Sequence, residues 1–371
     1  MVISPPSSRP RLPLSRRLAF PLSLSLSIAL TASACTPDDP TPTGTGGTGG
    51  AAGQAGTAGT GASASTGGTG GTAPAGGTGG SAGSGGTTTT TFPENPNCLV
   101  PEGASDLIHE GIVAPGLVCT RFPAPLAAPR DVLKTKSGRI FVSEFGAGRI
   151  VEHTPGGFVP IATGLVAPIG LREENATTLL VSEEGAQSVS RIDIATGTHT
   201  LIAKVGQNVT YLANGPDNAA YVSSFKELAD TKKGIIFRVD LATSAATPFA
   251  TGVNVPEGLF FDPQSRLHVA EWLLPSAVLR FPAAGGDAQS AATLATGFNN
   301  IYGLAPDGQG GLYAGDHAGR IVHVAPDGTQ TDIVKDIARP GGIFRTPEGD
   351  LWIAEFVDFG QTGYLLHIEG L

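Results

Sequence analysis

The feature that most constrains this chain is a block of 39 to 47 residues that recurs six times before the C-terminus. Each copy contains an apolar run that ends in a small residue and, in five of the six copies, an acid. The runs are GRIFVSEF (138–145), TLLVSEE (178–184), AAYVSSF (219–225), RLHVAEW (266–272), GLYAGDH (311–317) and DLWIAEF (350–356). A repeat of this length predicts a stacked or ring-shaped architecture built from one unit.

Each unit contains four short β-rich segments separated by Pro, Gly and Asp turns, and no helical periodicity competes with them. Six such units predict an all-β fold, a six-bladed β-propeller over residues 129–371. The last unit stops after its third strand, so the N-terminal closure segment 92–128 is expected to supply the missing outer strand. DLIHEGIVAP (106–115) reads like the outer strand FVPIATGLVAP (158–168), and we predict that it completes the last blade.

The first 34 residues are expected to be a targeting signal. Four arginines between residues 9 and 17 precede an apolar stretch, and no acid occurs before Asp38. The stretch ends in LTASAC (30–35), which resembles a bacterial lipobox with Ala32 in the place where leucine is usual. The resemblance implies a lipoprotein signal peptide over 1–34, cleavage before Cys35 and lipidation of its thiol.

Residues 35–91 join this signal to the repeats and consist almost entirely of Gly, Thr, Ala and Ser after the lipidated cysteine. Such a composition cannot bury enough apolar surface to offset the entropy of ordering, so we expect a disordered tether. A Gly-rich coil of this length spans roughly 40 Å. We therefore expect an exported lipoprotein, anchored to the outer membrane or cell envelope, that meets the membrane only through its lipid.

Charge and cysteine content limit the partners and the compartment. Removal of residues 1–34 takes four arginines and no acid from the formal charge of −9, which leaves −13. A chain this acidic is not expected to bind nucleic acid. With Cys35 lipidated, two cysteines remain in an oxidising compartment, and a Cys98–Cys119 disulfide that staples the ring closure is the simplest pairing. Two free buried thiols are the alternative.

The repeat units resemble those of the large six-bladed propeller group that includes gluconolactonase- and regucalcin-like, strictosidine-synthase-like, paraoxonase and NHL-repeat proteins. The resemblance covers about residues 104–371. It implies the fold, whereas the activities of such propellers range from lactone hydrolysis and lyase steps to pure binding.

Comparing equivalent positions in the six units distinguishes structural from functional residues, because a residue that recurs in every blade is expected to stabilise the blade. The acid that ends the second strand recurs in five units, so Asp316 is expected to be structural, accepting hydrogen bonds from loop amides. The same comparison assigns His323 and His367 to a polar slot that holds arginine in other blades. His317 is different, because it is the one histidine on the predicted ligand-facing rim, where it can serve as a base or a hydrogen-bond donor.

Two sets of unique residues are expected to meet at one mouth of the channel. The residues after the second-strand acids form a largely aromatic rim that includes Phe145, Trp272 and Phe356. The residues before the first strands add further polar and aromatic groups. We predict catalytic roles for His317, Glu257 and Arg130, and ligand contacts from Asn300, Tyr302, Arg339, Trp272, Phe145 and Phe356.

The family resemblance also implies a divalent cation held by Glu, Asn and Asp residues that each precede a glycine. Only Glu257, in VPEGL, fits that pattern fully. A remodelled calcium or magnesium site would use Glu257, Asn300, Asn208 and Asp131. Without a metal, the same mouth remains a polar site able to orient a small ligand.

Two functions follow from these observations. The propeller mouth is expected to bind a small organic molecule and to transform it, as a gluconolactonase-like hydrolase or lyase by resemblance. The alternative is a non-catalytic module that binds protein or polysaccharide at the cell surface. In either case we expect a monomer.

Overall fold

The computed structural model of the 371-residue chain describes residues 98–104, 108–229, 231–357 and 362–371. The predicted signal peptide, Cys35 and the tether lie outside the described residues. Within the described part, β-strands dominate and the one helical element is a 3-10 turn, η1 (Ala288–Ser290). No helix in this part is long and apolar enough to cross a bilayer.

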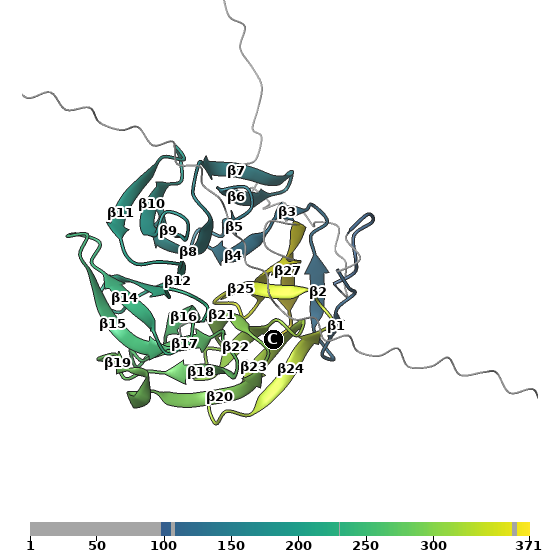
Figure 1. Cartoon of the computed structure of the whole chain (residues 1–371). Coiled ribbons are helices and arrows are strands. Elements are labelled where there is room, and N and C mark those ends of the chain that lie inside the picture. Colours follow the sequence, from purple (N-terminus) through teal and green to yellow (C-terminus); the bar gives the residue numbers. More distant parts are fainter. Residues whose placement is uncertain (1–97, 105–107, 230, 358–361) are drawn as a thin grey trace, which may run out of the picture. The chain divides into compact units, whose positions relative to one another are not determined.

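Six sheets form a ring around a central channel, as predicted (Figure 1), and all but one of their strand pairs are antiparallel. Each repeat contributes an innermost strand at the centre of the ring and successive strands towards the perimeter. Blade one contains β4 (Pro129–Lys134), β5 (Ile140–Glu144), β6 (Arg149–Thr154) and β7 (Gly157–Thr163). Blade two contains β8 (Pro168–Asn175), β9 (Thr178–Glu183), β10 (Ser188–Asp193) and β11 (His199–Lys204). Blade three contains β12 (Val209–Asn214), β13 (Ala220–Ser224), β14 (Gly234–Val239) and β15 (Ala246–Val253), with the short β19 (Gly286–Asp287) beside β15.

The last three blades have the same arrangement, and the N-terminal segment adds strands to the fifth and sixth blades. Blade four contains β16 (Pro256–Phe261), β17 (Leu267–Glu271), β18 (Ser276–Arg280) and β20 (Ala292–Phe298). Blade five contains β21 (Ile301–Pro306), β22 (Leu312–Asp316), β23 (Arg320–Val324), β24 (Gln330–Lys335) and β1 (Ile112–Val113). Blade six contains β25 (Arg339–Arg345), β26 (Leu351–Phe356), β27 (Thr362–Glu369) and β2 (Val118–Arg121), with β3 (Leu126–Ala127) pairing at the start of β27.

The N-terminal segment closes the ring as predicted, but with other residues. β2, not 106–115, is the outer strand of the sixth blade, with Cys119 opposite Ile368 and Arg121 opposite Leu366. Ile112 and Val113 instead extend the fifth blade, opposite Lys335 and Val334. The prediction failed at this point because apolar alternation marks an outer strand without specifying which sheet edge it joins.

The closure is fixed by a disulfide and a buried arginine. Cys98 and Cys119 are bonded, as predicted, and both are fully buried. The disulfide ties residue 98 to the closing strand β2, next to Arg121. The N-terminal segment is therefore part of the propeller and does not lie loosely on its surface.

One equivalent position on the six innermost strands is occupied by Asp131, Gly170, Tyr211, Gly258, Gly303 and Gly342. Four of these residues are glycine because adjacent strands approach each other closely at the channel. A Cβ atom on Gly258 would meet the carbonyl oxygen of Tyr302, and one on Gly303 would meet that of Gly341. The two exceptions, Asp131 and Tyr211, place their side chains towards the inside of the ring. The Tyr211 hydroxyl donates to the Arg130 carbonyl over 2.9 Å, which links blade three to blade one.

Candidate functional site

The strand register places two rings of side chains at the same mouth of the channel. The first residue of each innermost strand pairs with the end of the second strand, as in Pro129 opposite Glu144 and Pro256 opposite Glu271. The inner ring comprises the residues that directly precede the equivalent positions held by glycine in four blades: Arg130, Ile169, Thr210, Glu257, Tyr302 and Gly341. The rim comprises the residues after the second-strand acids, Phe145, Glu184, Phe225, Trp272, His317 and Phe356.

The second-strand acids between these rings are structural, as predicted. Each accepts a hydrogen bond from the backbone amide 17 residues earlier, at 2.6 Å from Ala127 to Glu144, 2.9 Å from Val166 to Glu183, 2.8 Å from Asn254 to Glu271, 3.0 Å from Asn299 to Asp316 and 2.8 Å from Ala338 to Glu355. In blade three the direction is reversed, and the Ser224 hydroxyl donates to the Gln207 carbonyl over 2.6 Å. The acids thus satisfy buried amides that would otherwise destabilise the loops.

A pocket of about 220 Å³ opens between the rings. Five of its lining residues are apolar or aromatic and five are polar, a mixture typical of small-molecule sites. The lining residues are Arg130, Ile169, Glu184, Asn208, Thr210, Phe225, Leu228, Glu257, Trp272 and Tyr302. Predicted site residues from both rings therefore share one cavity.

Glu257 is the central polar group of this pocket. Its residue is only 4 % exposed, and no described residue hydrogen-bonds its Oε2 atom. Burial raises the pKa of its carboxyl well above the usual range, and the neighbouring Glu184 raises it further. Arg130 and the Thr210 hydroxyl oppose this shift. A buried carboxyl that lines a cavity and has an unpartnered oxygen is a group prepared for a ligand.

Arg130 lies between aromatic rings at the side of the pocket formed by blades six and one. Its guanidinium carbon is 4.4 Å from the ring centroid of Phe356 and 4.8 Å from that of Phe145. The Tyr302 ring is 5.8 Å away. Such cation–π contacts stabilise the charge and fix the orientation of a residue that is 2 % exposed. Arg130 is therefore a fixed positive charge beside Glu257.

His317 continues the aromatic cluster on the opposite side of Tyr302. The two rings are stacked with centroids 4.1 Å apart, and Phe356 lies 5.4 Å from the imidazole. Burial, followed by the charges of Arg339 and Arg130, lowers the pKa of His317 to about 2. A neutral imidazole of this kind favours a hydrogen-bonding role over general-base chemistry near neutral pH.

The four residues predicted to hold a divalent cation do not all reach the pocket. Glu257 and Asn208 line it, whereas Asp131 and Asn300 do not. Asp131 accepts from the Leu171 amide at 2.9 Å and from the Arg172 guanidinium at 2.8 Å. These side chains therefore do not form the predicted oxygen cage, and a calcium or magnesium site stays a prediction.

The two asparagines of that set have a backbone role. Asn208 and Asn300 occupy equivalent positions in their blades and have φ angles of 41° and 66°, a region that asparagine tolerates better than most residues. Their amide nitrogens donate to the carbonyls of Lys226 and Trp272, each over 2.7 Å. Asn300 thus helps to position the Trp272 loop beside the pocket. Arg339 is exposed and does not line the pocket.

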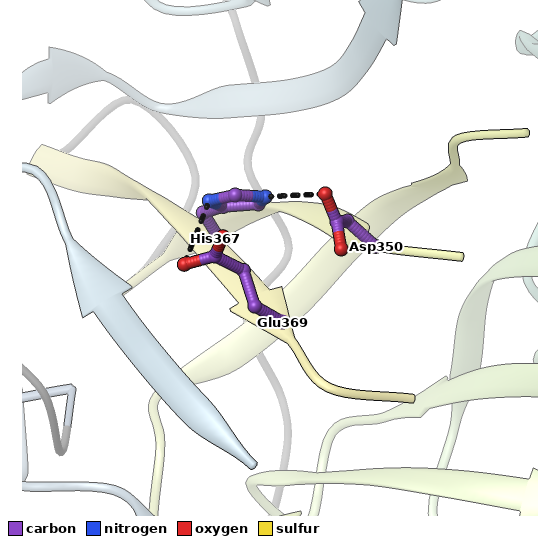
Figure 2. A group of neighbouring side chains, drawn as sticks. All are labelled: Asp350, His367 and Glu369. Atoms are coloured by element: carbon purple, nitrogen blue, oxygen red, sulfur yellow. Dashed lines mark ion pairs between the residues drawn. The ribbon is translucent and has the colours of Figure 1, made fainter. Parts of the chain in front are cut away.

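A separate cluster of Asp350, His367 and Glu369 lies in the sixth blade, with a carboxylate near each nitrogen of the imidazole (Figure 2). His367 Nε2 is 3.3 Å from Asp350, and its Nδ1 is 3.9 Å from Glu369. Other blades carry the same type of pair, Arg191 with Glu174, Arg238 with Asp217 and His323 with Asp307. The repetition identifies the Asp350–His367 pair as a blade contact, in agreement with the structural role predicted for His323 and His367.

Five of the lining residues are not among the predicted site residues: Ile169, Glu184, Thr210, Phe225 and Leu228. Glu184 carries a detectable signal, because it is the one acid at a rim position that is aromatic in most blades. Leu228 lies in the extended loop of blade three, whose length also marks it as unusual.

Fold and pocket together define a six-bladed β-propeller with a small-molecule-sized cavity at one mouth of its channel. No known family profile and no curated protein matches the chain. Solved structures do match it. A gluconolactonase from Xanthomonas campestris superposes with a TM-score of 0.60 at 15 % identity, covering 75 % of this chain and 98 % of that one.

Two other similar structures belong to different functional classes. Regucalcin from Agrobacterium tumefaciens, described as a calcium-binding protein, gives a TM-score of 0.55 at 17 % identity, with 67 % of this chain and 93 % of that chain covered. The PQQ-bound aldose sugar dehydrogenase from Streptomyces coelicolor gives 0.52 at 12 % identity, with 69 % and 100 % covered. At these identities the likeness establishes the fold alone.

Proposed function

We propose that this propeller binds a small organic molecule in the pocket at its channel mouth. The observation that carries the proposal is the buried carboxyl of Glu257, a residue that lines the cavity and has one oxygen without a partner among the described residues. The cavity of about 220 Å³ is below the usual range of drug-sized ligand sites, roughly 300–1,000 Å³. The ligand is therefore small, comparable to a single ring.

The reaction proposed for the site is hydrolysis of a lactone or a related ester. Gluconolactonases are among the similar structures, which supports this reaction class without assigning it. Arg130 is the fixed positive charge that would stabilise a developing oxyanion, and Glu257 is the group that would exchange a proton with the ligand. His317 does not line the pocket, so its predicted role would be indirect, through the stacked ring of Tyr302.

A second candidate function is non-catalytic binding of protein or polysaccharide. Such binding would use the partly exposed rim rings of Phe145 and Trp272, since Phe225 and Phe356 are buried. The incomplete set of cation ligands favours it. In both cases we propose an exported lipoprotein in which the tether presents the mouth at a distance from the membrane.

The test combines activity with ligand-induced stability in the full-length chain. Proton release from D-glucono-1,5-lactone and from a panel of simple lactones and esters is measured in a pH-stat with EDTA, calcium or magnesium. The thermal midpoint is recorded under the same conditions. Hydrolysis that is lost in Glu257→Gln supports the enzyme, and a rise in midpoint with either ion supports a metal site, since binding to the folded state alone raises stability. Hydrolysis unchanged in Glu257→Gln would place the activity elsewhere.

A further inference from the structure

The mouth pocket contains two acids that the blade repeat does not explain. Glu257 is the only acid among the six inner-ring residues, and Glu184 is the only acid among the six rim residues. The second-strand acids, by contrast, recur in five blades and accept hydrogen bonds from loop amides. Both unique acids line the same cavity, although they come from different blades. They therefore serve the pocket and not the blade.

Acidic residues outnumber basic residues in the pocket. Of the described residues that line it, two are acidic and Arg130 is the one base. The Arg130 guanidinium is held against Phe356 and Phe145, at the edge of the cavity. Burial raises the pKa of both Glu184 and Glu257, and their proximity raises that of Glu257 further. A positive charge bound between the two acids would relieve both effects.

The walls of the pocket favour an organic cation over a metal ion. Phe225, Trp272 and Tyr302 line it, and the faces of such rings attract ammonium groups. Calcium takes about six to eight oxygen ligands, whereas the lining offers two carboxylates, Asn208 and Thr210. Glu257 also lines this cavity, and its buried Oε2 atom has no hydrogen-bond partner among the described residues, so it is an acceptor available at the pocket wall.

We propose that the mouth pocket recognises its ligand through an organic ammonium group, with Glu257 and Glu184 as the two countercharges and Phe225, Trp272 and Tyr302 as the aromatic wall. This assignment rests on the proposed function, namely that the pocket is a small-molecule site. It specifies that the ligand accepted by the site carries a primary or quaternary ammonium group.

The experiment compares cations with neutral molecules of the same shape. Binding of choline and of 3,3-dimethyl-1-butanol, and of benzylammonium and benzyl alcohol, is measured by calorimetry on the full-length chain in nonionic detergent at pH 7.5. We expect each cation to bind at least tenfold more tightly than its neutral partner. Glu257→Gln and Glu184→Gln should each reduce that preference at least fivefold.

Glu227→Gln is the matched control, because Glu227 is exposed and adjoins the lining residue Leu228 without lining the pocket. It changes the net charge equally and should leave the preference unchanged. Thermal unfolding of each variant shows whether the fold persists, and Glu184→Gln tests the pair if Glu257→Gln fails to fold.

The outcomes separate this proposal from the one on which it rests. Equal binding of cations and neutral partners, or a cation preference that survives both acid variants, would overturn the ammonium assignment while leaving a small-molecule pocket. Binding of calcium or magnesium in place of all the organic cations would also overturn it. If neither the four compounds nor the lactone panel binds, both proposals fail.

Discussion

The guanidinium of Arg121 and the carboxylate of Glu355 form a two-point ion pair, Nε to Oε2 and Nη2 to Oε1, each over 2.8 Å. Both side chains are fully buried. The same guanidinium donates to the carbonyls of Leu99 and His109, each at 3.0 Å. One side chain of the closing strand β2 therefore joins the N-terminal segment to the last blade.

Breaking this pair should weaken the whole ring. Arg121→Met leaves the Glu355 carboxylate buried without its countercharge, and removing one partner of a buried pair lowers the free energy of unfolding by about 3–5 kcal/mol. Equilibrium unfolding in guanidinium chloride measures the change. Arg139→Met, which removes a partly exposed pair with Glu152, is the control and should lower it by about 1 kcal/mol or less. Equal losses in the two variants would contradict a special role for the closure.

The inner glycines give a second prediction. In Gly258→Ala the new methyl group would meet the Tyr302 carbonyl oxygen on the adjacent innermost strand, so the strands must separate. Overpacking of this kind typically lowers the free energy of unfolding by about 1–3 kcal/mol. Gly156→Ala is the matched control, since the nearest atom to its Cβ is Thr154 Oγ1 at 3.9 Å. Urea denaturation of both variants checks this, and a harmless Gly258→Ala would mean that the innermost strands tolerate wider spacing.

The fold was predictable from the sequence because the same four-strand pattern recurs in six repeat units. Blade number, strand register and the structural role of Asp316 all follow from comparing equivalent positions. The identity of the closing strand was not predictable, because β1 and β2 are both short and the choice between them depends on the buried contacts of Arg121. The site was predictable only as a set of ring positions. Which of them share the cavity depends on side-chain directions, and these leave the following predicted residues outside its lining: Asp131, Asn300, Arg339, His317, Phe145 and Phe356.

His153 should make stability depend on pH. Burial, then the nearby His367, lowers its pKa from 6.5 to about 4. The unfolded chain therefore binds a proton between these values that the folded chain does not, and stability falls as the pH decreases from about 6.5 to 4.

His153→Phe keeps the aromatic contacts with Phe122 and Phe158 and removes the titration. The variant should retain more stability at pH 4.5 than the natural chain, by on the order of 2 kcal/mol relative to their difference at pH 7.5. Denaturant midpoints at the two pH values give the comparison. His199→Phe, at an exposed position of β11, is the control. Parallel losses in the natural chain and His153→Phe would show that other groups cause the acid sensitivity.

Glu257→Gln should stabilise the chain while impairing its site. The pKa of Glu257 is raised in the folded state, so the folded chain retains a proton that the unfolded chain releases above about pH 4.5. The natural chain therefore loses stability as the pH rises, and the neutral glutamine does not. We expect the variant to exceed the natural chain by about 1 kcal/mol or more at pH 8, with a smaller difference at pH 5. Thermal and denaturant midpoints at both values measure it, with Glu227→Gln as the exposed control. A variant less stable at both pH values would mean that Glu257 holds the ring together, and its free oxygen would then no longer indicate a ligand.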